Sequence, residues 1–178
     1  MSRTDIRVLT YNVQSPSHGD WPGRRELIQA GIAGLDPDVV LLQEDTGDVL
    51  GEPWHIAAHT HRSGDGVGAA LYSRWPITDV HELDLRLTDR VDLPWAAAVI
   101  AEIDTPSGPL MVAHHKPTYH VGYALERELQ AVACARQIER LGNYVFVVAP
   151  LHVRDNFNFA VCQRAFMLNL HVVEGNGE

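Results

Sequence analysis

The sequence predicts an α/β fold, in which strands and helices alternate along the chain. Short apolar runs at residues 6–11, 39–42 and 145–149 have the composition of strands that are buried in a sheet. Between the first two runs, residues 24–35 carry apolar side chains at helical spacing. The chain therefore begins with a strand, a helix and a second strand, the unit from which parallel sheets are built.

The first helix is predicted at residues 24–35, after a Pro22-Gly23 pair that favours a helix start. Asp36-Pro37-Asp38 then breaks this helix before the second strand begins. The apolar face of the helix is expected to comprise Leu27, Ile28, Ile32 and Leu35.

Four more strands are predicted in the middle of the chain, at 54–58, 67–73, 95–103 and 110–114. Turn-rich segments separate them, among them Ser63-Gly64-Asp65-Gly66. A longer helix is predicted from about Tyr123 to Leu141. The side chains expected to face inward from it are Leu125, Leu129, Val132, Ile138 and Leu141.

The segment after Pro150 has a different residue pattern from the rest of the chain. Apolar and polar residues alternate around 157–161 and again around 166–172, which predicts two further strands. With 178 residues and no repeat or linker, the sequence predicts a single domain over 1–178. A chain of this length buries about 70% of its unfolded surface, so it needs no disulfide for stability.

Composition restricts the partners and the compartment that we expect. The net charge is −9, and Lys116 is the only lysine, so no basic stripe is present to grip duplex nucleic acid through many phosphates. The sequence shows no basic and apolar leader and no membrane span, which predicts a soluble, cytoplasmic protein. Cys134 and Cys162 are expected to be buried thiols, with a disulfide or a zinc site as the alternatives.

Two polar side chains stand where predicted strands end. Asn12 closes the run from Ile6, and Glu44 closes the run from Val39. Neighbouring strand ends bring such side chains together, and carboxylate and amide oxygens are the ligands that Mg²⁺ prefers. The pair predicts a Mg²⁺ site, with Mn²⁺ as the alternative ion. Taken singly, Asn12 would be a turn residue and Glu44 a solvated carboxylate.

Histidines supply the next candidates. His114, His115 and Lys116 end an apolar strand, where donors and a positive charge can meet a phosphate. Strand alternation separates the two histidines, so we expect His115 at the phosphate and His114 in packing. His59 and His61 suit either a transition-metal site or, more simply, a surface loop.

Five motifs in one order give the chain a resemblance to a known family. They are Leu9-Thr10-Tyr11-Asn12-Val13, Leu41-Leu42-Gln43-Glu44, the segment from Gly66 to Ile77, His115-Lys116-Pro117 and Glu126-Arg127-Glu128-Leu129-Gln130. In this order they resemble the endonuclease/exonuclease/phosphatase superfamily, whose members are DNase I-like. The resemblance covers residues 5–149.

The resemblance implies a fold and a site. The fold would be a DNase I-like four-layer α/β/β/α sandwich, incomplete on its C-terminal side, with the site at one end of the two facing sheets. The family's metal-binding asparagine and glutamate would fall on Asn12 and Glu44, and its phosphate-contacting histidine on His115. Tyr119 would take the place of a tyrosine that some members direct at the phosphate, unless it packs on the surface.

The chain departs from the family after Ala149. Where the family has Gly-Asp-Phe-Asn, with an aspartate that orients the attacking water, this chain has Pro150-Leu151-His152-Val153. Asp155 and Asn158, in a similar string a few residues later, are candidate substitutes in the catalytic site. The family's closing Ser-Asp-His is absent from the sequence. A shortened or frame-altered family member would explain this change in the sequence after Ala149. A sheet left uncovered by the missing strands would expose apolar surface and favour self-association.

The sequence thus supports a Mg²⁺-dependent phosphoester hydrolase as the first hypothesis, with impaired catalysis as the expected cost of the missing groups. The substrate, whether nucleic acid, nucleotide or lipid head group, is left open. A catalytically inactive relative that binds a phosphorylated ligand or a partner is the alternative. A third possibility, an α/β domain without a site, predicts that Asn12, Glu44 and His115 do not converge.

Overall fold

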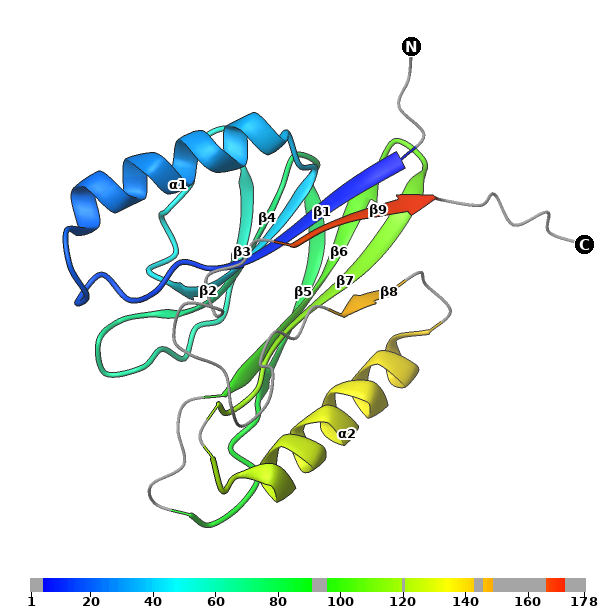
Figure 1. Cartoon of the computed structure of the whole chain (residues 1–178). Coiled ribbons are helices and arrows are strands. Elements are labelled where there is room, and N and C mark those ends of the chain that lie inside the picture. Colours follow the sequence, from blue (N-terminus) through cyan, green and yellow to red (C-terminus); the bar gives the residue numbers. More distant parts are fainter. Residues whose placement is uncertain (1–4, 91–95, 120, 143–145, 149–165, 172–178) are drawn as a thin grey trace, which may run out of the picture.

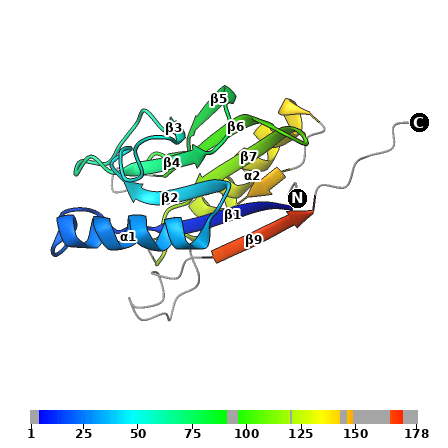
Figure 2. The ribbon, with the colours of Figure 1, turned by 90° about the horizontal axis from the view of Figure 1, so that it is seen from above.

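Two β-sheets lie face to face between two helices in the computed structural model, which describes residues 5–90, 96–119, 121–142, 146–148 and 166–171. Helix α1 (Trp21–Leu35) packs on the outer face of one sheet, and helix α2 (Ala124–Leu141) packs on the outer face of the other (Figure 1). The layers follow in the same order in a view from above (Figure 2). The four-layer α/β/β/α sandwich predicted from the sequence is therefore confirmed.

The first sheet carries the strand ends at which Asn12 and Glu44 were predicted to meet. Strands β1 and β2 run parallel on either side of the α1 crossover, and their neighbours pair with them in antiparallel fashion. The order of strands is β3 (His55–Ala58), β4 (Gly68–Ser73), β2 (Val39–Asp45), β1 (Asp5–Asn12) and β9 (Phe166–His171). Strand β9 confirms one of the two predicted tail strands, and 157–161 lies outside the described residues.

The second sheet has the order β5 (Ile77–Asp84), β6 (Ala97–Thr105), β7 (Gly108–Lys116) and β8 (Phe146–Val148). Strand β8 runs parallel to β7, and the other pairs are antiparallel. Strand β5 was not predicted from the sequence. It pairs only with β6 in the described sheet, and most of its side chains are exposed, so it lacks the apolar run that marks a buried strand.

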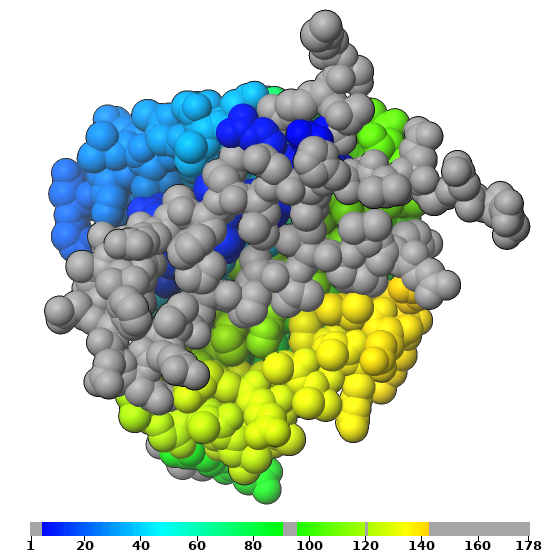
Figure 3. All heavy atoms as spheres, turned by 45° about the vertical axis from the view of Figure 1, so that its right-hand side comes forward, coloured from blue at the N-terminus to red at the C-terminus, as the bar shows by residue number. Residues whose placement is uncertain are grey.

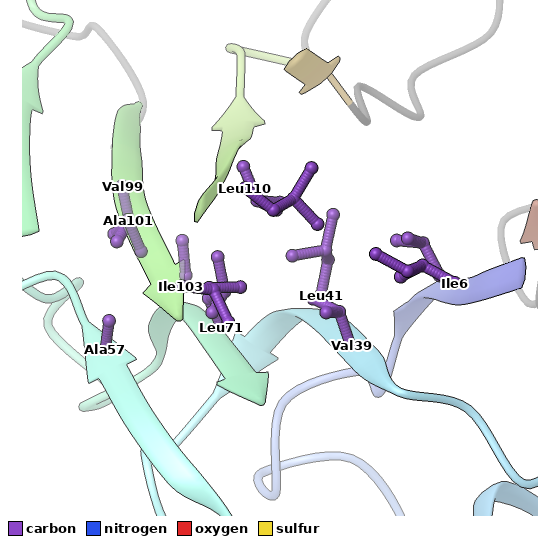
Figure 4. Packing of buried hydrophobic residues seen from close by; sticks show 12 residues of the cluster. Ile6, Val39, Leu41, Ala57, Leu71, Val99, Ala101, Ile103 and Leu110 are labelled. Carbon is purple, nitrogen blue, oxygen red and sulfur yellow. The ribbon is translucent and has the colours of Figure 1, made fainter. Parts of the chain in front are cut away.

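The main hydrophobic core lies between the two sheets. Alternate residues of β1, β2 and β4 meet alternate residues of β6 and β7, as the strand period of two requires. Figure 4 shows this contact, with Leu41 and Leu71 from the first sheet close to Ile103 and Leu110 from the second. The inner faces pack together and each outer face carries a helix, so this arrangement does not support self-association through an uncovered sheet.

Helix α1 begins one turn before the predicted start. The Asp20 carboxylate accepts a hydrogen bond from the Gly23 backbone N–H and caps the helix, and Pro22 occupies the first turn, where its missing N–H costs nothing. Ile28 and Ile32 are buried against the sheet as predicted. The prediction was wrong for Leu27 and Leu35, which are 75% and 36% exposed, because only the narrow line of positions four residues apart faces the sheet.

Helix α2 is rotated relative to the prediction. Leu125, Leu129 and Val132 are exposed, whereas Glu126, Gln130 and Cys134 are buried. The prediction of the inward face was therefore wrong in the first half of the helix, although Ile138 and Leu141 do pack on the sheet. Helix α2 (yellow) forms an outer surface opposite α1 (blue) in Figure 3.

Polar contacts explain this rotation of α2. The Gln130 side chain accepts a hydrogen bond from the Thr118 backbone N–H at 3.0 Å and donates one to the Leu85 carbonyl at 2.9 Å, all in buried positions. The Glu126 carboxylate lies 3.3 Å from the Arg90 guanidinium. Buried backbone groups require partners, so these bonds override the apolar pattern of the helix. Neither helix is long and apolar enough to cross a membrane, among the residues described.

Candidate active site

The parallel pairing of β1 and β2 brings Asn12 and Glu44 into contact. Asn12 lies opposite Gln43 in the strand register, one residue from Glu44. The Asn12 side-chain Nδ2 donates a hydrogen bond to Glu44 Oε1 at 2.9 Å, across 32 positions of sequence. Two of the three side chains that were predicted to converge are therefore placed together at one end of the sheet.

A β-bulge presents the Glu44 carboxylate. The register between β2 and β4 shifts between Gln43 and Asp45, and Glu44 has a φ of 58° in the left-handed region. Such a bulge redirects one side chain away from the pleat. As a result Gln43 and Asp45 are buried while Glu44 is partly exposed. Its second oxygen, Oε2, accepts a hydrogen bond from the Ser15 backbone N–H at 3.0 Å.

Asp45 anchors the segment that follows the bulge. Its Oδ2 accepts a hydrogen bond from the Tyr72 hydroxyl at 2.5 Å, and its Oδ1 accepts one from the Gly47 N–H at 2.6 Å. The same hydroxyl oxygen accepts a bond from the Val49 N–H at 3.2 Å. Burial raises the pKa of Asp45 and also raises the pKa of Tyr72. This buried network holds the chain rigid on the C-terminal side of Glu44.

The second sheet reaches the site through His114. Its Nε2 lies 2.9 Å from Gln43 Nε2, and Gln43 Nε2 also donates to the Thr10 hydroxyl at 3.0 Å. Burial lowers the pKa of His114 to about 3, with a further contribution from His115, so the imidazole is neutral. His114 is fully buried, as the packing prediction requires, and its contact with Gln43 joins the ends of β2 and β7.

His115 faces the other side of β7. It is buried and lies opposite Ala98 in the register, and Ala98 packs with Cys134 of α2. Alternation therefore directs the His115 side chain to the α2 face of the sheet, while His114 and Lys116 are directed to the face that looks toward Glu44. A role for His115 at the phosphate stays a prediction.

Lys116 is the basic group on the site side of β7. Only 5% of it is exposed, and its Nζ lies 5.7 Å from the centre of the Tyr119 ring. Burial lowers the pKa of Lys116, while the charges of Glu44 and Asp65 oppose that shift. Tyr119 itself is 56% exposed at the rim. The lysine motif was recognised in the sequence, but its closeness to Glu44 depends on the bulge and on strand order.

Asp65 is a second carboxylate near the site that the sequence did not reveal. It lies on the exposed loop between β3 and β4, which reads as a turn in the sequence. Hydrogen bonds from the hydroxyls of Ser63 and then Ser15 hold the pKa of Asp65 below its usual range. Ser15 thus lies between the two carboxylates, since its backbone N–H binds Glu44.

The donor set suits a hard divalent cation that keeps several water ligands. Glu44 offers two carboxylate oxygens and Asn12 an amide oxygen, each with one protein hydrogen bond. No group of three or more His, Cys, Asp or Glu side chains within the described part of the chain is placed to hold a metal ion. Asp155 and Asn158, the predicted substitutes for the missing motif, lie outside the described residues.

His59 and the two cysteines were the other candidates for a metal site or, for the cysteines, a disulfide. His59 is buried, its Nδ1 accepts a hydrogen bond from the His61 N–H at 3.0 Å, and its Nε2 lies 3.1 Å from the Leu83 carbonyl. These contacts occupy both ring nitrogens, so His59 is a structural residue of its loop. Cys134 is a buried free thiol whose pKa is raised by burial, and Cys162 lies outside the described residues.

The fold has close structural relatives of low sequence identity. D. rerio TDP2 complexed with a single-strand DNA product matches with a TM-score of 0.73 and 16% identity, over 86% of this chain and 63% of that one. The human Nocturnin catalytic domain with bound sulfate matches with a TM-score of 0.67 and 19% identity, over 84% and 65%. ANGEL2, a 2',3'-cyclic phosphatase in complex with adenosine-2',3'-vanadate, matches with a TM-score of 0.67 and 18% identity, over 82% and 53%.

These relatives establish the fold, and the sequence itself establishes the family. This chain spans less than two thirds of the length of each of the three structures. No curated protein matches the sequence significantly. The model of the Endonuclease/Exonuclease/phosphatase family matches residues 9–148, which include Asn12, Glu44 and Lys116. The chain therefore belongs to the endonuclease/exonuclease/phosphatase family, as its motifs predicted.

Proposed function

We propose that this protein is a phosphoester hydrolase that depends on a divalent cation, with Mg²⁺ as its ion and Mn²⁺ as a substitute. The observation that carries the proposal is the 2.9 Å contact between Asn12 and Glu44 at the ends of adjacent parallel strands. Open α/β sheets collect ligands at that position. A carboxylate and an amide there provide hard oxygen ligands, as Mg²⁺ requires.

The chemistry is divided among a few groups. Bound at Glu44 and Asn12, the ion would polarise a phosphoryl oxygen and neutralise charge that develops on the phosphate. The carboxylate of Glu44 keeps its direction because the bulge, the Ser15 N–H and Asn12 fix it. Tyr119, at the rim after β7, and His115, which β7 directs toward α2, stay the predicted phosphate contacts. Asp155 is the predicted group for orienting the attacking water, and Asn158 is the predicted group for steadying the phosphate.

The substrate class follows from charge and from the relatives. A protein with a net charge of −9 suits a substrate that is held at one phosphate rather than along a duplex. Among the relatives, TDP2 was crystallised with a single-strand DNA product and ANGEL2 with adenosine-2',3'-vanadate. We therefore propose a nucleotide or a single-stranded nucleic acid end as substrate, in a cytoplasmic setting.

Hydrolysis of bis(4-nitrophenyl) phosphate with and without Mg²⁺ tests the proposal. The expected result is turnover that requires Mg²⁺ and falls at least a hundredfold in Glu44→Gln, as the loss of a group that holds the ion implies. Glu128→Gln is the matched control, because Glu128 is an exposed carboxylate on α2, away from the site. Mg²⁺-independent turnover, or equal rates in the two variants, would refute the assignment.

A catalytically inactive binding protein is the second candidate. The observation that favours it is Pro150-Leu151 at the place where the family's Gly-Asp motif is expected. That candidate predicts Mg²⁺-dependent binding of phosphate, abolished in Glu44→Gln, without turnover of any phosphoester. The same two variants therefore separate a hydrolase from a binding protein.

A further inference from the structure

The only lysine of the chain is a buried residue at the candidate active site. All other basic side chains, apart from histidine, are arginines. Long charged side chains are rarely buried unless they are paired, because their desolvation is costly. Lys116 is nonetheless only 5% exposed. A charged lysine at this buried position requires nearby negative groups that offset its desolvation.

Strand geometry places Lys116 on the face of β7 that looks toward the end of β2. His114 and Lys116 are two residues apart on β7 and share one face, and His114 lies 2.9 Å from Gln43, the residue before Glu44. The Glu44 bulge at the end of β2 directly follows Gln43, and Lys116 follows His114 by two residues in β7. The charge of Glu44 accordingly favours the protonated form of Lys116 and opposes the lowering of its pKa by burial.

A second carboxylate also favours the charged lysine. Among the described residues, the charge of Asp65 acts on the pKa of Lys116 in the same direction as that of Glu44, and the Ser63 and Ser15 hydroxyls hold the pKa of Asp65 below the usual range. The face of the Tyr119 ring, 5.7 Å from Nζ, adds a favourable contact for a cation. Among the described residues, the charges of two carboxylates and one aromatic face thus favour the Lys116 cation, and of these groups only Glu44 belongs to the proposed metal site.

We infer that Lys116 is a substrate-binding residue whose ammonium stays between Glu44 and Asp65 until Glu44 engages a divalent cation, and then contacts a non-bridging oxygen of the substrate phosphate. This inference rests on the proposed function. Once the Glu44 carboxylate binds a cation, its charge no longer attracts Lys116, and the two positive groups repel each other. A phosphate anion placed between them relieves that repulsion, while Asp65 and Tyr119 keep the lysine at the site.

If Lys116 exchanges the Glu44 carboxylate for the substrate phosphate when the cation binds, its substitution should affect the two ligands in opposite directions. A purely structural lysine would not show this. Without phosphate, Lys116 competes with the metal for Glu44, so Lys116→Met should bind Mg²⁺ more tightly than the wild type. With Mg²⁺ bound, Lys116 attracts phosphate, so the same variant should bind phosphate more weakly. A substitution that only damaged the fold would weaken both ligands.

Calorimetric titration of the full chain with MgCl₂, and then with inorganic phosphate at saturating Mg²⁺, measures both effects. For Lys116→Met we expect Mg²⁺ binding about threefold or more tighter and phosphate binding at least tenfold weaker. Lys116→Arg should restore phosphate binding to within a few-fold of the wild type, since it retains the charge. Arg140→Met, which removes one exposed positive charge from α2, should leave both affinities unchanged.

The wild-type protein allows an independent measurement if Lys116→Met fails to fold. With lysine labelled with ¹³C at Cε, the protein has a single labelled side chain. Its resonance should shift on addition of Mg²⁺, and shift again when phosphate follows, with no phosphate response in the absence of Mg²⁺. A resonance that ignores phosphate at saturating Mg²⁺, or weaker binding of both ligands in Lys116→Met, overturns the inference.

The two proposals fail in different ways. If Glu44→Gln and the wild type bind no Mg²⁺, both the metal site and the lysine exchange are refuted. If Mg²⁺ binding depends on Glu44 but phosphate binding does not depend on the charge at position 116, only the lysine exchange is refuted.

Discussion

The Asn12 side chain donates a 2.9 Å hydrogen bond to the Glu44 carboxylate, and this bond joins the ends of β1 and β2. Both residues are held from behind as well. Asn12 Oδ1 accepts a bond from the Gln14 N–H at 2.8 Å, and Glu44 Oε2 accepts one from the Ser15 N–H at 3.0 Å. The loop after β1 therefore fixes the geometry of the pair before any ligand arrives.

Asn12→Ala should weaken Mg²⁺ binding about 10- to 100-fold, because it removes an oxygen ligand and the donor that directs Glu44. Calorimetric titration with MgCl₂ measures the change. Gln137→Ala, which removes an amide from α2, is the matched control and should bind Mg²⁺ as the wild type does. An unchanged affinity in Asn12→Ala would show that the amide has no part in the metal site.

Tyr72→Phe should lower the free energy of unfolding by about 1–3 kcal/mol, because Asp45 loses a donor and the buried Val49 N–H loses its acceptor. Urea denaturation followed by circular dichroism measures the loss. Asp45→Asn should cost less, since its amide oxygen still accepts from the Gly47 N–H, its NH₂ group can donate to the Tyr72 hydroxyl, and the charge that burial disfavours is gone. A smaller loss in Tyr72→Phe than in Asp45→Asn would contradict this ranking.

His114 should make the protein less stable in acid. Its folded-state pKa is about 3, below the ordinary value of 6.5, so the unfolded chain takes up a proton that the folded chain refuses. The contribution is intact above about pH 6.5 and is lost as the pH falls toward 3, by up to about 1.4 kcal/mol per pH unit. His114→Gln should flatten this part of the urea-stability profile, and the exposed control His55→Gln should not. Equal slopes in both variants would mean that His114 titrates normally.

The rotation of α2 can be tested with two truncations. Gln130→Ala should lower the free energy of unfolding by about 2–5 kcal/mol, because the Thr118 N–H and the Leu85 carbonyl lose their partner in a buried place. Leu125→Ala should change stability by less than about 0.5 kcal/mol, because Leu125 is 60% exposed. Urea denaturation compares them. The reverse order would mean that the apolar pattern, and not the polar contacts, orients the helix.

Sequence patterns predicted both helices and most of the strands, and missed the strand with the most exposed side chains. The apolar runs of β1, β2 and β4 identified these strands because both of their faces are covered. Strand β5, mostly exposed, carries no such run. In α2 the periodicity located the helix correctly but predicted the wrong inward face, since the buried Gln130 side chain supplies the partners of the Thr118 N–H and the Leu85 carbonyl.

The sequence by itself determined the family, the four layers, and the placing of Asn12 and Glu44 at strand ends, because these depend on local periodicity and on motifs read in order. Tertiary structure decided what surrounds that pair. The bulge that turns out Glu44, and the loop that delivers Asp65, depend on contacts between segments far apart in the chain. The register of β7, which directs Lys116 rather than His115 toward the carboxylates, depends on pairing across both sheets. No local pattern encodes such distances, because they arise only when the two sheets pack.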